Sequence, residues 1–359
     1  MNADCLGLID RIRKNHPTNG SLFLQFEECR IEVRSNSAEL RQELAHYFAG
    51  FVTGNHSPDI VITVHQAAPP DLRLSFNTKE PDPGKSRSKE EYCDLPDGRI
   101  VRKRLTGMVF IFSRTSHLAI GPCLSNANQV INFVNNRFIA WKLNRGYFLG
   151  HAAGVLYHSR GLALAGFSGM GKSTLALHMV SRGATFISND RLMAIRQGDG
   201  LQMTGVAKLP RINPGTALNN PHLDKVIPEA DKEKFRSLSG DSLWELEHKY
   251  DVFLDQCFGP DRFKLCGPMD ALFILNWQRQ DLPVRINQVD LARRRDLVPA
   301  FMKATGLFFI HDASRSPEDP GIDEYIELLG HCPVFEISGG IDFNTAADAG
   351  LRYMKCGTI

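Results

Sequence analysis

The sequence has no long apolar run and almost no net charge. None of its apolar stretches approaches the roughly 18 residues that cross a bilayer. The N-terminal segment contains acidic residues and no apolar core of signal-peptide length, so we expect a cytoplasmic protein without membrane contacts. The formal charge of +2 lacks the basic excess that nucleic-acid binding by bulk electrostatics requires, so no nucleic-acid partner is expected.

Cysteine is present, but not in metal-binding patterns. The eight cysteines are scattered along the chain and include no Cys-x-x-Cys pair. This argues against a structural zinc site and, in a reducing compartment, against structural disulfides. We expect these side chains to pack as small apolar residues.

The length of the chain indicates two domains. A chain of 359 residues exceeds what one hydrophobic core usually supports. We expect an N-terminal α+β domain over 1–146 and an α/β domain over 147–359. Patterns in the first part predict strands in 21–35, a helix in 37–51, a strand in 59–66, an exposed loop in 69–89, a hairpin turning at 96–98, a strand in 108–113 and a helix in 125–146. No chemically distinctive group of residues stands out in this part, and its role is not indicated.

One motif carries clear chemistry. The segment 166–173, GFSGMGKS, matches the phosphate-binding pattern G-x-x-x-x-G-K-[ST], with a predicted strand before it and an amphipathic helix after it. Its glycines let backbone N–H groups approach phosphate oxygens, and the helix N-terminus favours the anion. The lysine reaches the β- and γ-phosphates, and the serine hydroxyl is a ligand for Mg²⁺. We expect ATP to bind along Gly166, Phe167, Ser168, Gly169, Met170, Gly171, Lys172, Ser173 and Thr174.

An acidic residue follows the next predicted strand. The segment 184–190 is strand-like and ends at Asp190. An acid at this point lies at the carboxyl end of the sheet, where a Mg²⁺ ligand or catalytic acid belongs. We therefore expect one Mg²⁺ held by Ser173, Asp190, phosphate oxygens and water, which suits the few protein ligands that magnesium takes. The alternative is a solvated loop carboxylate.

Two further candidates are weaker when taken alone. His151 precedes the loop and is flanked by small residues, so it is either a packed or capping residue or a member of the site. The turn-rich segment 205–218 contains Lys208 and Arg211, which can meet phosphate. The alternative for this segment is a structural loop.

Taken together, these residues resemble bacterial HPr kinase/phosphorylase, and more closely the HPr kinase-related proteins called kinase B. The resemblance is best over about 148–220: a histidine at His151, the G-x-S-G-x-G-K-S loop, a helix that ends in Arg182-Gly183, and an acid on the next strand. It implies an α/β fold of the HPr kinase type, with a mixed sheet flanked by helices. It also implies that His151 lines the active site and that the chain forms a homo-oligomer.

The sequence also departs from that family. Asn189-Asp190 replaces an Asp-Asp pair, whose first acid the family uses as base and acid toward the substrate serine, and Gln202 falls near a metal-binding Glu. Because Asn189 cannot take a proton, Asp190 or His151 does this work, or the reaction differs, or transfer is very weak. HPr is therefore not assumed as substrate, nor is the reverse reaction.

The sequence thus predicts an ATP- and Mg²⁺-dependent kinase that phosphorylates a hydroxyl on a protein serine or a small molecule. Lys172 and Arg211 would neutralise the transferring phosphoryl group, Asp190 would bind metal or orient the nucleophile, and His151 would line the acceptor side. One alternative is an ATP-binding pseudokinase or regulatory module with little or no phosphotransfer. Another is an ATPase that drives assembly or conformational change and releases phosphate to water.

Overall fold

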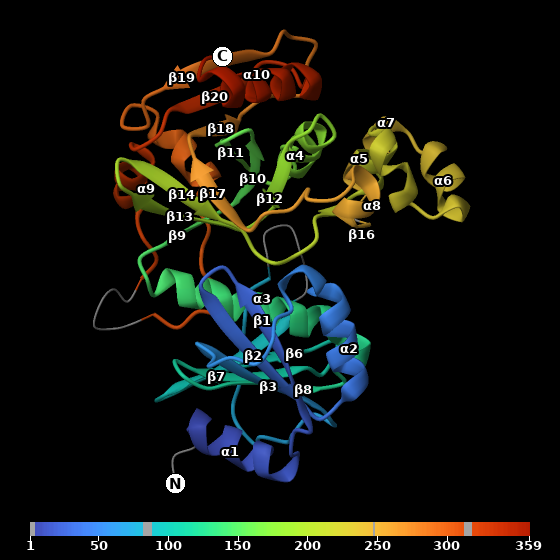
Figure 1. Cartoon of the computed structure of the whole chain (residues 1–359), viewed down its shortest axis with the longest axis vertical. Coiled ribbons are helices and arrows are strands. Elements are labelled where there is room, and N and C mark those ends of the chain that lie inside the picture. The colour runs from blue at the N-terminus through green and yellow to red at the C-terminus, as the bar shows by residue number, and fades with distance from the viewer. Residues whose placement is uncertain (1–3, 82–87, 247, 312–317) are drawn as a thin grey trace. The chain divides into compact units, whose positions relative to one another are not determined.

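The chain divides into two compact units (Figure 1). The computed structural model describes residues 4–81, 88–246, 248–311 and 318–359. The first unit consists of Met1–Trp141 and Thr305–Glu318, and the second of Lys142–Ala304 and Asp319–Ile359. The first unit therefore includes a short segment that returns to it from far along the chain, which no pattern in the sequence indicated.

The first unit is built on an eight-stranded mixed sheet. Its strand order is β1-β2-β3-β8-β7-β6-β5-β4. The strands are β1 (Gly20–Phe26), β2 (Cys29–Ser35), β3 (Ile60–Gln66), β4 (Asn77–Thr78), β5 (Glu90–Leu95), β6 (Gly98–Lys103), β7 (Val109–Ser113) and β8 (His117–Gly121). β2, β3 and β8 run parallel, and the other neighbouring strands are antiparallel.

Helices cover both faces of this sheet because its strands alternate apolar residues between the faces. One face, which includes Val109 and Ile111 of β7, packs against α1 (Cys5–Asn15). On the other face Phe110 and Phe112 contact Phe133 of α3 (Ala127–Leu143). The remaining helical segments of this unit are α2 (Ala38–Tyr47), η1 (Ala49–Phe51) and η2 (Leu124–Asn126).

Most predictions for this part of the chain are confirmed. The strands predicted in 21–35, 59–66 and 108–113 are present, and the hairpin between β5 and β6 turns where expected. α2 begins after Ser37, whose hydroxyl accepts from Leu40 N at 3.2 Å as an N-cap. β8 was not predicted. The predicted loop 69–89 contains the short strand β4, and its residues 82–87 lie outside the described part of the chain.

The second unit is centred on a six-stranded mixed sheet with the order β12-β10-β11-β18-β20-β19. Its strands are β10 (Ala152–Tyr157), β11 (Arg160–Gly166), β12 (Thr185–Ser188), β18 (Ala271–Leu275), β19 (Arg285–Val289) and β20 (Val334–Ser338). β11, β18 and β20 are parallel, so their carboxyl ends meet at one edge of the sheet. β12 points the same way, because it and β11 are both antiparallel to β10. That edge is where open α/β sheets bind ligands.

The two faces of this sheet are covered differently. On one face, Leu162 and Leu164 of β11 share a core with α4 (Lys172–Val180) and α10 (Phe343–Cys356). On the other, Ala163 and Ala165 share a core with a four-stranded sheet of order β17-β14-β13-β9. Those strands are β9 (Phe148–Gly150), β13 (Leu192–Gln197), β14 (Gly200–Thr204) and β17 (Cys266–Met269), and the same core contains η4 (Arg295–Ala300) and α9 (Ile322–Leu329).

A group of short helices completes the second unit beside α4 (Figure 1). It consists of α5 (Pro214–Leu218), η3 (Pro221–Val226), α6 (Glu229–Arg236), α7 (Gly240–Glu245) and α8 (Leu254–Phe258), with the two-stranded ladder β15 (Arg211–Ile212) and β16 (Tyr250–Asp251). The chain is thus a mixed α/β protein with several sheets.

All eight cysteines carry free thiols. Among the described residues, no helix combines the length and apolar character needed to pass through a membrane.

Candidate functional site

The glycine-rich loop joins β11 to α4 at the carboxyl edge of the six-stranded sheet. Gly169 and Gly171 have φ of +83° and +85°, a region that side-chain-bearing residues rarely adopt. A Cβ atom at Gly171 would also lie 2.6 Å from Cζ of Phe343. Glycine is therefore required at this position both for the backbone conformation and for space. On the far side of the loop, the Trp277 indole N–H donates to the Met170 carbonyl at 3.0 Å, which ties the loop to the segment after β18.

The N-terminus of α4 is open toward this loop. Its N-cap residue is Gly171, and no side chain caps it within the described residues. Because the first N–H groups of a helix lack partners inside the helix, those at the start of α4 remain free to bind an anion.

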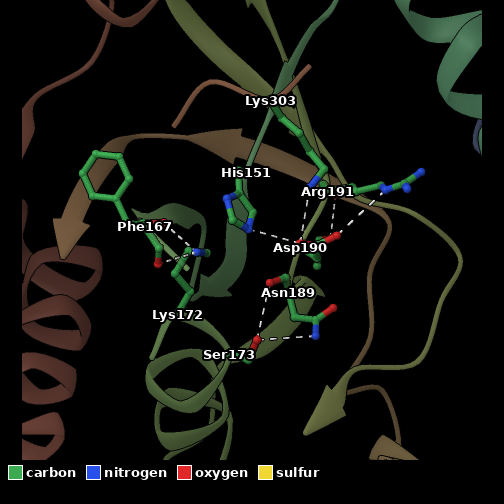
Figure 2. A network of polar contacts seen from close by, with 10 residues as sticks. His151, Phe167, Lys172, Ser173, Asn189, Asp190, Arg191 and Lys303 are labelled. Carbon is green, nitrogen blue, oxygen red and sulfur yellow. Dashed lines mark hydrogen bonds and ion pairs between the residues drawn. The ribbon is translucent and has the colours of Figure 1, made fainter. Parts of the chain in front are cut away.

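Lys172 is buried, and within the described residues its ammonium group donates to backbone carbonyls. The residue is 7% exposed, and Nζ donates to the carbonyls of Gly166 at 2.6 Å and Phe167 at 3.2 Å (Figure 2). Burial lowers the pKa of Lys172 to about 8, against a smaller opposing influence from Asp190. The loop therefore holds a cation that a phosphate oxygen would satisfy better than these two neutral carbonyls do.

Ser173 connects the start of α4 to the end of β12. Its hydroxyl lies 3.4 Å from the Asn189 carbonyl and 3.5 Å from Asn189 Nδ2. In Figure 2 the Asn189 side chain lies beside this hydroxyl, on the side of α4 that faces β12. The next residue of the helix, Thr174, shares a hydrogen bond of 2.9 Å with Thr216 of α5.

Asp190 is the centre of a polar cluster next to the loop. His151 Nε2 lies 3.2 Å from Asp190 Oδ1, Lys303 Nζ lies 3.5 Å from the same oxygen, and Arg191 Nε lies 3.9 Å from Oδ2. Figure 2 shows the His151 and Lys303 side chains pointing toward this carboxylate, while the end of the Arg191 side chain points away from it. Burial by itself would raise the pKa of Asp190. The hydrogen bond from His151 and the charge of Lys303 outweigh it, so the pKa lies well below its usual range. The carboxylate is therefore ionised at neutral pH.

Backbone pairing places His151 and Lys303 together. His151 lies between β9 and β10, and its N–H donates to the Phe301 carbonyl at 2.6 Å. Lys303 N donates in turn to Leu149 O at 3.2 Å. Lys303 was not predicted. Its segment matches no motif and is far from Asp190 in the sequence, so only the tertiary fold reveals it.

Not every predicted residue joins this cluster. Lys208 lies near enough for the charges of Asp190, Arg191 and Arg211 to act on it, and burial lowers its pKa to about 8. Arg211 pairs with Asp251 at 3.1 Å and donates to the Lys249 carbonyl, and within the described residues it has no contact with the loop. Gln202 lies on β14, where its side chain accepts from the Tyr147 hydroxyl at 3.3 Å.

The cluster contains few groups that could hold a metal. No group of three or more His, Cys, Asp or Glu side chains suited to a metal occurs in the described ranges. The Asp190 carboxylate is 54% exposed and follows the residue that contacts the Ser173 hydroxyl. One hydroxyl and one carboxylate form a donor set that fits Mg²⁺, which keeps several waters and phosphate oxygens in its shell. The same set is too small for a structural zinc site.

Comparison with known proteins gives little further help. No family model and no curated protein matches the chain. Among solved structures, the Hpr(Ser) kinase/phosphatase from Coxiella burnetii aligns over 56% of this chain and 86% of its own length. The identity is 12% and the TM-score is 0.29. A similarity this low does not establish a shared fold.

Proposed function

We propose that this protein is an ATP-dependent phosphotransferase that transfers the γ-phosphoryl group to a hydroxyl acceptor. The observation that carries this proposal is that two features lie at the same edge of the sheet. One is the uncapped N-terminus of α4, and the other is the ionised Asp190 carboxylate in contact with His151. The helix N-terminus suits binding of the phosphates, and the Asp190–His151 pair suits the γ-phosphoryl end of ATP, where the transfer would occur. A loop that only bound phosphate would not need the second element.

Mg²⁺ would be held by the Ser173 hydroxyl and the Asp190 carboxylate, and would neutralise charge on the phosphates. Lys172 would exchange its two backbone carbonyls for oxygens of the β- and γ-phosphates. Lys303, missed by the sequence patterns, would add a second positive charge beside the transferring group. Phosphoryl transfer depends mainly on such positioning and electrostatics.

The acceptor hydroxyl would approach from the side of His151. Its oxygen forms the new bond to phosphorus as the bond to the β-phosphate oxygen breaks and ADP leaves. The hydroxyl proton passes to His151 or Asp190, the two groups of the cluster that can take it. A protein serine and a small alcohol fit this chemistry equally well.

The decisive test is transfer from γ-labelled ATP in a lysate of the native host. We expect one labelled species, protein or small molecule, with the purified wild-type protein and none when Lys172→Ala protein is added. Its mass identifies the acceptor. Labelled inorganic phosphate without a labelled acceptor would contradict the proposal and favour an ATPase.

One observation supports a different function. Asn189 lies beside the Ser173 hydroxyl and cannot accept a proton, which favours an ATP-binding regulatory module with little transfer. The Asn189→Asp variant separates the two: a large gain in turnover would indicate a degenerate site, and a loss would indicate a site adapted to its own acceptor.

If ATP binds at this loop, its binding should depend on pH. Because the pKa values of Lys172 and Lys208 are lowered to about 8, both lysines lose part of their charge above that pH. Nearby phosphates favour the charged form, so binding of ATP and Mg²⁺ at pH 8.5 should take up about one proton, and affinity should fall as the pH rises toward 9.5. Titration calorimetry in two buffers of different ionisation enthalpy measures the uptake. Affinity independent of pH above 8 would contradict the assignment.

A further inference from the structure

A small basic cavity lies in the first unit, whose role neither the sequence nor the proposed function explains. It has a volume of about 130 Å³ and is lined by Arg13, Thr18, Arg34, Thr63 and His65. Arg13 lies in the last turn of α1, and the other residues come from the loop after α1 and from β2 and β3. All of them belong to one compact unit.

The sheet face beneath α1 changes character at this cavity. Thr63 and His65 of β3 are paired in register with Leu118 and Ile120 of β8, which belong to the apolar core under α1. Paired residues of parallel strands point to the same face. Apolar residues would therefore continue this core at positions 63 and 65, but the chain has a hydroxyl and an imidazole there.

His65 is the least expected of these residues. It is 0% exposed, and neither ring nitrogen has a hydrogen-bond partner among the described residues. Burying a polar group without a partner is costly, so such a group in a native protein calls for an explanation. Burial lowers the pKa of His65 to about 4, with smaller contributions from His16 and Arg13, so the ring is neutral and carries one N–H donor.

Arg13 leaves positive charge at the cavity, whereas the charge of Arg34 is neutralised by Glu32. Arg34 binds Glu32 through two hydrogen bonds, of 2.9 and 2.8 Å. Within the described residues, the one ion pair of Arg13 is a 3.8 Å contact with Asp10, whose side chain is 78% exposed to solvent. The Arg13 Nε–H donates to Thr63 Oγ1 at 3.3 Å, which orients the guanidinium while its outer N–H groups remain available. Burial, and then the charge of Arg34, lower the pKa of Arg13.

We propose that this cavity binds a tetrahedral oxyanion, either free phosphate or the phosphate end of a small phosphomonoester. A volume of about 130 Å³ admits several water molecules, so the cavity has room for a small ion. Arg13, the N–H groups of Arg34 that Glu32 does not use, Thr18 and His65 line the cavity and would supply the donors that four oxygens require. A planar carboxylate has only two oxygens, so it would leave some of these hydrogen-bond donors without an acceptor.

The test is calorimetric titration of inorganic phosphate into the full-length Lys172→Met protein, so that the glycine-rich loop contributes little. We expect binding of one phosphate per chain. Arg13→Gln should weaken it about tenfold or more, because a charge-assisted hydrogen bond is lost. Arg11→Gln, which removes the same charge from an exposed position on the same helix, should leave the affinity within about twofold. Equal affinities in these two variants would reveal an adventitious ion only and overturn the proposal.

A second variant separates binding from packing. His65→Leu should weaken phosphate binding and leave the melting temperature of the phosphate-free protein unchanged or raised, because it removes an unpartnered buried polar group. A lower melting temperature with unchanged phosphate affinity would show that His65 serves packing alone, against the proposal. Tighter binding of a phosphomonoester such as glycerol 3-phosphate would identify an esterified ligand, and tighter binding of free phosphate the ion itself. Tighter binding of acetate than of either would contradict the tetrahedral class.

Discussion

Replacing Lys172 by methionine is expected to abolish stabilisation by ATP and Mg²⁺ and, at the same time, to raise the melting temperature of the ligand-free protein. The ammonium group is nearly buried, and its hydrogen bonds go to two backbone carbonyls. Its pKa falls from 10.5 to about 8, which means that folding costs free energy while the lysine is charged. Methionine fills a similar volume without that charge.

The size and pH dependence of this effect follow from the shift. Each pKa unit corresponds to about 1.4 kcal/mol, and loss of the hydrogen bonds to the two carbonyls offsets part of the gain. A net gain of about 1 kcal/mol would raise the melting temperature by about 2–4 °C. The cost is fully present below pH 8 and disappears as the pH rises from about 8 toward 10.5. The advantage of the methionine variant over wild type should shrink across the same range.

Differential scanning calorimetry with and without ATP and Mg²⁺ measures both effects. Lys264→Met is the matched control, because Lys264 is exposed and lies in the same unit. The control should melt close to wild type and keep its response to ATP. A Lys172→Met protein that melts below wild type, or that ATP still stabilises as strongly, would refute the role given to this lysine.

Replacing Asp190 by asparagine is expected to lower phosphoryl transfer about 10³-fold, a loss comparable to that of other charge-stabilising groups in active sites. In the proposed reaction this carboxylate binds Mg²⁺ with Ser173, and His151 and Lys303 both contact it in the structure. Asparagine keeps the shape but removes the charge. ATP affinity should change much less, because in the proposed complex the loop and Lys172 would provide most of the phosphate contacts.

Single-turnover transfer as a function of Mg²⁺ concentration separates these contributions. Asp199→Asn makes the same change at an exposed turn between β13 and β14 and should leave turnover unaffected. Because the pKa of Asp190 lies well below its usual range, any fall in wild-type activity between pH 5 and 7 must come from another group. Turnover of Asp190→Asn within about tenfold of wild type would rule out its proposed part in the reaction.

Local rules predicted the elements of this site better than they predicted its neighbours. The order of strand, glycine loop, helix and strand follows from short-range sequence patterns, and the left-handed φ of Gly169 and Gly171 explains the glycines. That His151 lines the site was expected only through the family resemblance, and its contact with Asp190 was not predicted. Whether these residues bind ATP remains a prediction.

Long-range contacts set the limit of sequence reasoning. Lys303 reaches Asp190 because its segment pairs with β9, a relation that no local pattern encodes. In the structure Asp251 on the neighbouring strand pairs with the guanidinium of Arg211, and a contact of Arg211 with phosphate stays a prediction. Charge and turn composition could not distinguish these two partners. The basic cavity beside His65 could not be predicted from local sequence patterns either, because β2, β3 and α1 come together only in the folded chain.

The late segment of the first unit, which begins at Thr305, affects how this unit folds during translation. Phe308 packs against Phe110, Phe112 and Phe133, and its carbonyl accepts a hydrogen bond from the buried Arg137. At about 5–20 residues per second, about 10 to 30 seconds pass between synthesis of the end of α3 and synthesis of Phe308. During this time the aromatic cluster lacks one ring and Arg137 lacks its acceptor. The N-terminal unit can therefore reach its final packing only after Phe308 has been synthesised.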